Sequence, residues 1–138
     1  MTLDYDALHE GVELPTEHRT PTTEQVVAFC NATGNQGPQF LDPEFAKERM
    51  GLPGPIIPGN MKQGFLDQYL RRHFGRHQIT RLQLNHRRPD VHNVEMTIGG
   101  EVTRTYDVDG RRMVDLEIHI DNPQGDRSVR GAASIAYD

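Results

Sequence analysis

The sequence has 138 residues, of which 25% are charged and 35% are apolar, with 20 acidic against 15 basic side chains. This length and composition suit one globular domain with a real core, so a single domain over residues 1–138 is expected. The net charge of -5 argues against nonspecific nucleic-acid binding. No apolar run approaches the roughly 18 residues of a membrane span. The acidic N-terminal stretch has no apolar signal core, which predicts a cytoplasmic protein.

The first half of the chain shows helical spacing broken by loops rich in proline and glycine. One helix is predicted to begin either with the Thr-Pro pair at residues 20–21 or with a capping box of Thr22 and Gln25. Gly34 is expected to end it. A short helix is predicted over residues 43–50, where a glycine follows.

The clearest helical pattern lies at about residues 60–74. Its apolar side chains recur with the 3.6-residue period and form one stripe: Met61, Phe65, Leu66, Tyr69, Leu70 and Phe74. Gly64 lies inside this helix, where glycine costs up to about 1 kcal/mol relative to alanine. Close packing against a neighbouring strand is therefore predicted at Gly64.

From residue 79 onward the sequence alternates as strands do. Strands are predicted at residues 79–88, 94–106, 114–120 and 128–137, with a hairpin turn at Asp109-Gly110. Tyr106 is placed on the same apolar face as Val102, and His119 falls on a polar face where exposure is expected. The economical architecture is α+β, with a long antiparallel sheet wrapped around the central helix.

Four residues that precede the central helix follow one another in a recognisable order: Gly34, Pro38, Asp42 and Ala46. With the loop GPIIPGNM they resemble the MaoC-like family, also called hydratase-2 or R-specific enoyl-CoA hydratases. That family's signature is roughly S-G-D-x-N-P-h-H-x-D-x-x-x-A, with h apolar. The resemblance covers about residues 20–137. It implies a single hot-dog fold and (de)hydration of acyl thioesters in fatty-acid or steroid side-chain metabolism, and no metal or other cofactor is expected.

The chain departs from this signature at the catalytic positions. The family's catalytic aspartate falls on Asn35 and its catalytic histidine falls on Phe40. An amide orients water but takes up no proton at neutral pH, and a phenyl ring does neither. General acid–base help is typically worth about 10²–10⁴-fold per group, so hydration by this chain alone should be crippled. Asp42, which matches the second signature aspartate, is kept as a candidate catalytic residue.

The resemblance also implies a binding surface at the start of the central helix. The family places the substrate carbonyl there, at Gly59 and Asn60 in this sequence, where a backbone N–H serves as an oxyanion donor. Pro55, Ile56 and Ile57 are suited to line a narrow apolar slot beside it. The alternative is that both isoleucines belong to the core.

Basic side chains gather between residues 71 and 88. This stretch holds six arginines, three histidines and no acidic residue. Arg87 and Arg88 are candidates for binding the phosphates of coenzyme A, because the arginine fork matches phosphate geometry. A solvated strand face is the alternative. Nucleic acid is disfavoured, since no aromatic platform is interleaved.

Three further side chains are of types that can act as reactive groups. His86 and His92 flank the stretch RRPDV, but their spacing fits no metal-ligand set, so both are expected to be structural or surface residues and no metal site is predicted. The single cysteine, Cys30, is expected to be a small buried hydrophobe.

The partner chemistry follows from the resemblance. Hot-dog folds pair edge to edge about two-fold axes, as a homodimer or as a heteromer, and in some relatives only one half keeps the Asp/His pair. We predict a non-catalytic subunit that completes a pocket for acyl-CoA or another acyl thioester with a second hot-dog subunit. Two alternatives stay open. One is a self-sufficient hydratase or lyase in which Asn35 positions water and Asp42 or His86 is the base, and the other is a thioester-binding module without chemistry.

Overall fold

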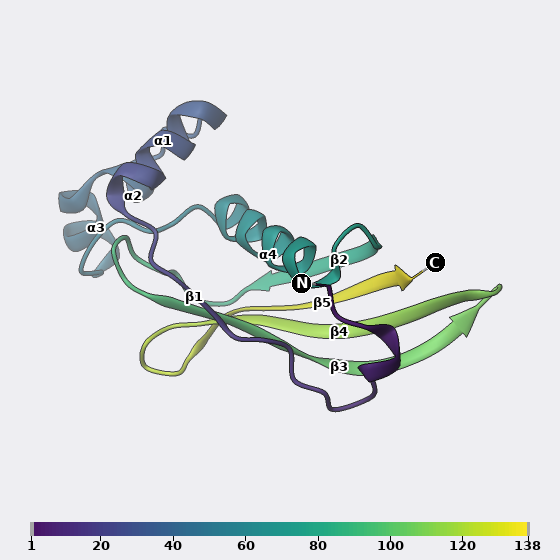
Figure 1. Cartoon of the computed structure of the whole chain (residues 1–138). Coiled ribbons are helices and arrows are strands. Elements are labelled where there is room, and N and C mark those ends of the chain that lie inside the picture. Colours follow the sequence, from purple (N-terminus) through teal and green to yellow (C-terminus); the bar gives the residue numbers. More distant parts are fainter. Residues whose placement is uncertain (1, 138) are drawn as a thin grey trace.

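The computed structural model describes residues 2–137. One antiparallel sheet of five strands, in the order β1-β3-β4-β5-β2, lies against helix α4 (Gly59–Phe74), while three shorter helices lie beyond one end of α4 (Figure 1). The predicted α+β architecture, a long sheet around a central helix, is confirmed. The strands are β1 (Glu17–Arg19), β2 (Gln78–His86), β3 (Met96–Val108), β4 (Arg111–Asp121) and β5 (Arg127–Tyr137). Within residues 2–137, no helix is long and apolar enough to cross a membrane.

The short helices begin and end where the sequence provides caps. Helix α1 (Thr23–Thr33) starts with the capping box of Thr22 and Gln25, and Gly34 ends it in the left-handed region at φ 72°. Helix α3 (Pro43–Met50) was also predicted. Helix α2 (Pro38–Leu41) was not, because four residues are too few to show a helical period. A 3-10 turn, η1 (Tyr5–Ala7), lies near the N-terminus.

Helix α4 buries the predicted apolar stripe against the sheet. Phe65 is 5% exposed, and Leu66, Tyr69 and Leu70 are fully buried. The predicted close packing at Gly64 is wrong, because a Cβ placed on this residue would meet no heavy atom of the described chain within 4 Å. The helical cost of this glycine is therefore not offset by any packing that the described chain provides.

A β-bulge changes the face of one predicted strand. In the β3–β4 pair, Val102 lies opposite Leu116, but the register shifts before Arg104, which lies opposite Asp115. Tyr106 consequently points to the outer face of the sheet, where its hydroxyl donates to the carboxylate of Asp115 at 2.9 Å. The prediction that Tyr106 shares the apolar face of Val102 is wrong, since alternation cannot reveal an inserted residue.

The strand that follows α4 does not pair with its neighbour in the sequence. Strand β2 crosses to the far edge of the sheet and pairs with β5, while the short β1 pairs with β3 at the opposite edge. Strands β3 and β4 form the predicted hairpin, with Asp109 at φ 51° and Gly110 at φ 79°. The order of the strands was not predicted, because it depends on long-range pairing.

Candidate functional site

An open groove of about 280 Å³ lies at the N-terminal end of α4. Its walls come from α2, from the proline-rich loop, from the first turn of α4 and from the end of β2 with the residues after it: Phe40, Ile56, Ile57, Gly59, Lys62, His86, Arg87, Arg88 and Pro89. Three stretches that are separate in the sequence thus meet at one helix terminus. Six of these residues belong to the predicted site.

The apolar wall of the groove is held in place by backbone hydrogen bonds. The N–H of Ile56 donates to the carbonyl of Gln39 at 2.9 Å, which ties the loop to α2 beside Phe40. The N–H of Ile57 donates to the carbonyl of Asp90 at 2.8 Å, and its side chain is only 2% exposed. The two predictions for the isoleucines therefore both hold in part: Ile56 is half-buried in the wall, and Ile57 is core that reaches the groove.

The first turn of α4 forms the end of the groove. Pro58 is the N-cap, and no side chain of the described residues caps this terminus. The first backbone N–H groups of a helix have no intrahelical acceptor, so they leave a partial positive charge at Gly59. His86 lies against this turn, because a Cβ at Gly59 would be in ordinary van der Waals contact with Nε2 of that imidazole, at 3.4 Å.

A buried ion pair underlies the groove. The ammonium of Lys62 donates to Oδ2 of Asp90 at 3.0 Å and to the carbonyl of Arg88 at 3.3 Å. The sequence analysis missed this pair, because the two residues are 28 positions apart. One signal was available: a lysine beside the apolar stripe in the first turn of a helix opposes the helix dipole, which indicates a compensating partner.

The imidazole of His86 lines the groove and has no hydrogen-bond partner within residues 2–137. Burial, helped by the nearby Lys62 ammonium, lowers its pKa, and the Asp90 carboxylate opposes that shift only in part. The imidazole is therefore neutral at neutral pH. A neutral imidazole both accepts and donates a proton, so His86 has the chemistry of a proton-transfer group.

Two guanidinium groups lie at the rim of the groove. The backbone N–H groups of Arg87 and Arg88 both donate to the carbonyl of Ser128, at 2.7 and 3.2 Å, which anchors the segment after β2 to β5. Both side chains are exposed, and the guanidinium of Arg88 lies 3.9 Å from the carboxylate of Asp126. This position suits contact with an anionic group on a molecule bound in the groove.

Four predicted site residues lie outside the groove lining. Asn35 follows α1, and its N–H donates to the carbonyl of Cys30 at 2.9 Å. The carboxylate of Asp42 caps α3, since Oδ1 accepts from the N–H of Glu44 at 3.0 Å. Pro55 is buried behind the wall, and Asn60 is exposed on α4. The structure therefore brings Phe40 to the groove without Asn35 or Asp42.

His92, His119 and Cys30 lie outside the groove, and each is at least half-buried. His92 is 7% exposed, and its Nδ1 lies 3.2 Å from the hydroxyl of Thr23. His119 is half-buried beside Gly99 and close to Asp121, so its predicted exposure is wrong. Cys30 is fully buried, as predicted. Among residues 2–137, no three His, Cys, Asp or Glu side chains gather as a metal site would require.

The long helix enclosed by an antiparallel sheet defines a hot-dog fold, and solved structures with this fold support that assignment. No family model and no curated protein matches the sequence. The (R)-hydratase from A. caviae involved in PHA biosynthesis is 21% identical, with a TM-score of 0.82, over 96% of this chain and 98% of that one. The MaoC-like dehydratase from Rhodospirillum rubrum is 16% identical, with a TM-score of 0.81, over 95% and 93%. The ChsH1-ChsH2 complex from Mycobacterium tuberculosis contains a chain that is 18% identical, with a TM-score of 0.80, over 94% and 98%.

The chain thus has the hot-dog fold of MaoC-like dehydratases and R-hydratases. Identities of 16–21% support a shared fold and leave the activity to be argued from the site itself. The assignment of Asn35 and Phe40 to the family's two catalytic positions stays a prediction.

Proposed function

We propose that this chain is a non-catalytic subunit of an enoyl-CoA hydratase or 3-hydroxyacyl-CoA dehydratase. It binds an acyl thioester, and a second hot-dog chain with an Asp/His pair completes the pocket. The observation that carries the proposal is Phe40, which lines the groove at the start of α4, where the resemblance implies a catalytic histidine. A phenyl ring offers apolar surface and transfers no proton, so the groove is built to hold an acyl group.

Three features of the groove support thioester binding. Phe40 and Ile56 supply an apolar wall for the acyl chain, as small-molecule sites generally do. The uncapped helix N-terminus at Gly59 favours the partial negative charge of a thioester oxygen. Arg87 and Arg88 at the rim suit the phosphates of coenzyme A or of a carrier-protein arm.

A partner is supported by the sheet and by one comparison. Strand β2 ends the sheet, and an unpaired strand edge is a ready site for pairing with another chain. The ChsH1-ChsH2 structure is a complex of two chains, and the chain compared there has the same fold as this one. In our proposal this protein occupies the place of one such chain, with the missing Asp/His pair supplied from the other.

The deciding experiment is a hydration assay with crotonyl-CoA and with a longer enoyl-CoA, on the wild type and on Asn35→Asp/Phe40→His. We expect a silent wild type and a gain of activity in the double variant. Binding of unreactive butyryl-CoA is measured on the same samples by calorimetry. Turnover by the isolated wild type would refute the non-catalytic role, and failure of butyryl-CoA to bind would refute the thioester site.

One observation favours a second candidate function, a self-sufficient hydratase or lyase. His86 is a neutral imidazole at the groove, beside the helix terminus where a thioester oxygen would lie. It would take a proton from water as the oxygen bonds to the β-carbon, and return that proton to the α-carbon. The electron pair of the double bond passes through the thioester enolate, so one water is added in sum.

The two functions differ in how turnover responds to His86. If the wild type is active, His86→Ala should lower kcat by about 10²-fold or more, while Asp42→Ala, which removes only a helix cap, should leave kcat close to that of the wild type. Activity that survives His86→Ala would remove this candidate.

A further inference from the structure

The proposed function requires a partner, and the charges along the open sheet edge indicate which kind. We propose that the free edge of β2 binds a different chain, whose edge strand is acidic, in preference to a second copy of this chain. The inference rests on the proposed function for the presence of a partner. It goes further in naming the partner's chemistry.

The free edge of β2 is the long open edge of the sheet. Its nine residues pair with β5 on one side and with no strand of the described chain on the other (Figure 1). The opposite edge is formed by β1, which has three residues and follows closely after Pro15. Because proline and short length both oppose strand pairing, β2 is the better site for pairing with a partner strand.

Side chains at this edge also suit a partner. Ile79, Leu82 and Leu84 are only partly buried against the core of this chain, so pairing at β2 would cover more of their apolar surface. Burial of apolar surface of this kind is the main favourable contribution in most protein–protein association. The edge thus presents both open backbone groups and partly buried apolar side chains to a partner.

The edge carries uncompensated positive charge. Residues 71–88 contain six arginines and no acidic residue, although the whole chain has a net charge of -5. Arg71 and Arg72 have carboxylate partners on α4 and β1. Arg76, Arg81 and Arg87 have none within residues 2–137; the guanidinium of Arg81 instead donates to the amide oxygen of Gln83 at 2.6 Å. Strand β5, which adjoins β2, is likewise free of acidic residues.

Pairing of β2 with a second copy of itself would bring basic segments together without any carboxylate between them. Two copies related by a two-fold axis place the strand antiparallel to itself, so residues on one side of the centre meet residues on the other. Because residues 71–88 hold no carboxylate, no register sets an arginine opposite an acidic side chain. Like charges directly opposite each other destabilise a strand pair, whereas an acidic partner strand would turn the same positions into attractive pairs.

The test makes an acidic-edged partner from the chain itself. In the variant Arg76→Glu/Arg81→Glu, one arginine in the turn before β2 and one on β2 become acidic, and neither one lines the groove. Sedimentation equilibrium is run on the wild type, on the variant and on their equimolar mixture. The ionic strength is about 0.01 M, where the screening length is about 30 Å. We expect wild type alone to be monomeric and the mixture to form a 1:1 complex at least about tenfold tighter than either self-association. Salt should weaken this complex.

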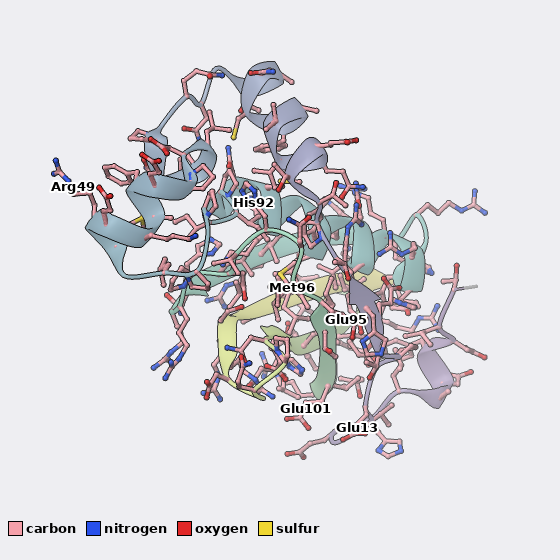
Figure 2. The ribbon with its side chains drawn as sticks, turned by 90° about the vertical axis from the view of Figure 1, so that its left-hand side faces the viewer. Glu13, Arg49, His92, Glu95, Met96 and Glu101 are labelled. Atoms are coloured by element: carbon pink, nitrogen blue, oxygen red, sulfur yellow. The ribbon has the colours of Figure 1, made fainter. Side chains whose placement is uncertain are left out.

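The matched control is Lys47→Glu/Arg49→Glu, which makes the same change of charge on α3. Arg49 lies at the outer margin of the short helices (Figure 2). Mixed with the wild type, this control should form no complex. Two results would overturn the inference: a wild type that dimerises at low salt, or an Arg76→Glu/Arg81→Glu variant that binds the wild type no more tightly than the control does.

Two precautions keep the result decisive. Circular dichroism checks each variant, and if the double variant fails to fold, the single variants Arg76→Glu and Arg81→Glu are mixed with the wild type instead. Butyryl-CoA binding reports on the groove independently of the edge. A failure of the proposed thioester site would therefore appear as absent butyryl-CoA binding. A failure of the proposal for the β2 edge would appear as absent complex formation in the sedimentation experiment.

Discussion

The ammonium of Lys62 lies 3.0 Å from the carboxylate of Asp90, and the two side chains are 3% and 4% exposed. This contact joins the first turn of α4 to the segment after β2, directly beneath the groove. The Lys62 ammonium also donates to the carbonyl of Arg88, so it holds the backbone of one rim residue in place. The shape of the groove therefore depends on a charge pair buried below it.

Removing one partner of this pair should be strongly destabilising. We expect Lys62→Met to lower the free energy of unfolding by about 3–5 kcal/mol, because it leaves the Asp90 carboxylate buried without a counter-charge. Urea denaturation measures the change. The exposed pair Asp67–Arg71 is the control, and Arg71→Ala should cost less than about 1 kcal/mol. Equal effects of the two substitutions would contradict this view of the pair.

Gly64 offers the opposite outcome, a stabilising substitution. Gly64→Ala should raise the free energy of unfolding by up to about 1 kcal/mol, since alanine is the better helix former and open space surrounds the new Cβ. Thermal unfolding of the isolated chain checks this. At Gly100 a Cβ would lie 2.5 Å from the carbonyl oxygen of Glu117, so Gly100→Ala should destabilise the chain. A loss of stability in Gly64→Ala would contradict the open space around this position of α4.

His92 should make stability depend on pH. Burial lowers the pKa of this imidazole from 6.5, with backbone groups of Ile56 and Phe40 opposing the shift. As the pH falls through 6.5, the unfolded chain takes up the proton first, so stability decreases toward acid. His92→Gln should weaken the dependence of the unfolding midpoint on pH below about 6.5.

The control for His92 is His18→Gln, at a side chain that is 58% exposed. The pKa values of His86 and His119 are also lowered by burial and both residues remain in the His92 variant, so the weakening should be partial. An identical pH profile for His92→Gln and the wild type would rule out this contribution.

Asp115 should contribute in the acidic range. Burial opposes its charge, but hydrogen bonds from Arg104, Ser134 and Tyr106 outweigh burial and lower its pKa from 3.8. The stability that this carboxylate contributes is present above pH 3.8 and is lost as the pH falls through the lower folded value. Asp115→Asn should cost about 1 kcal/mol at pH 7 and little at pH 2, with the exposed Asp107→Asn as control. A cost that does not change between the two pH values would exclude the charge as its source.

Local features of the chain were predictable because short-range chemistry decides them. The capping box at Thr22 and the left-handed glycine at residue 34 each act within one turn of helix, so sequence placed α1 closely. The stripe of α4 was predictable for the same reason. The face of Tyr106 was not predictable, because a bulge between Val102 and Arg104 moved this side chain to the other face of the sheet.

The candidate site was predictable only in part. The resemblance gave Phe40, the two isoleucines and Gly59 as site residues, and the basic stretch gave Arg87 and Arg88; the groove contains them all. It did not separate them from Asn35 and Asp42, which lie outside the lining. It also did not predict the buried ion pair of Lys62 with Asp90 or the contact of His86 with Gly59.

By itself, then, the sequence determined helices α1, α3 and α4, the four long strands and the class of fold, because caps, turns and hydrophobic periods act between near neighbours. Only the tertiary structure decided that β2 crosses to the far edge of the sheet. That crossing carries His86, Arg87 and Arg88 to the start of α4 and leaves a basic strand edge open. The physical reason is that strand order and buried charge pairs depend on contacts between residues far apart in the chain, which no local pattern records.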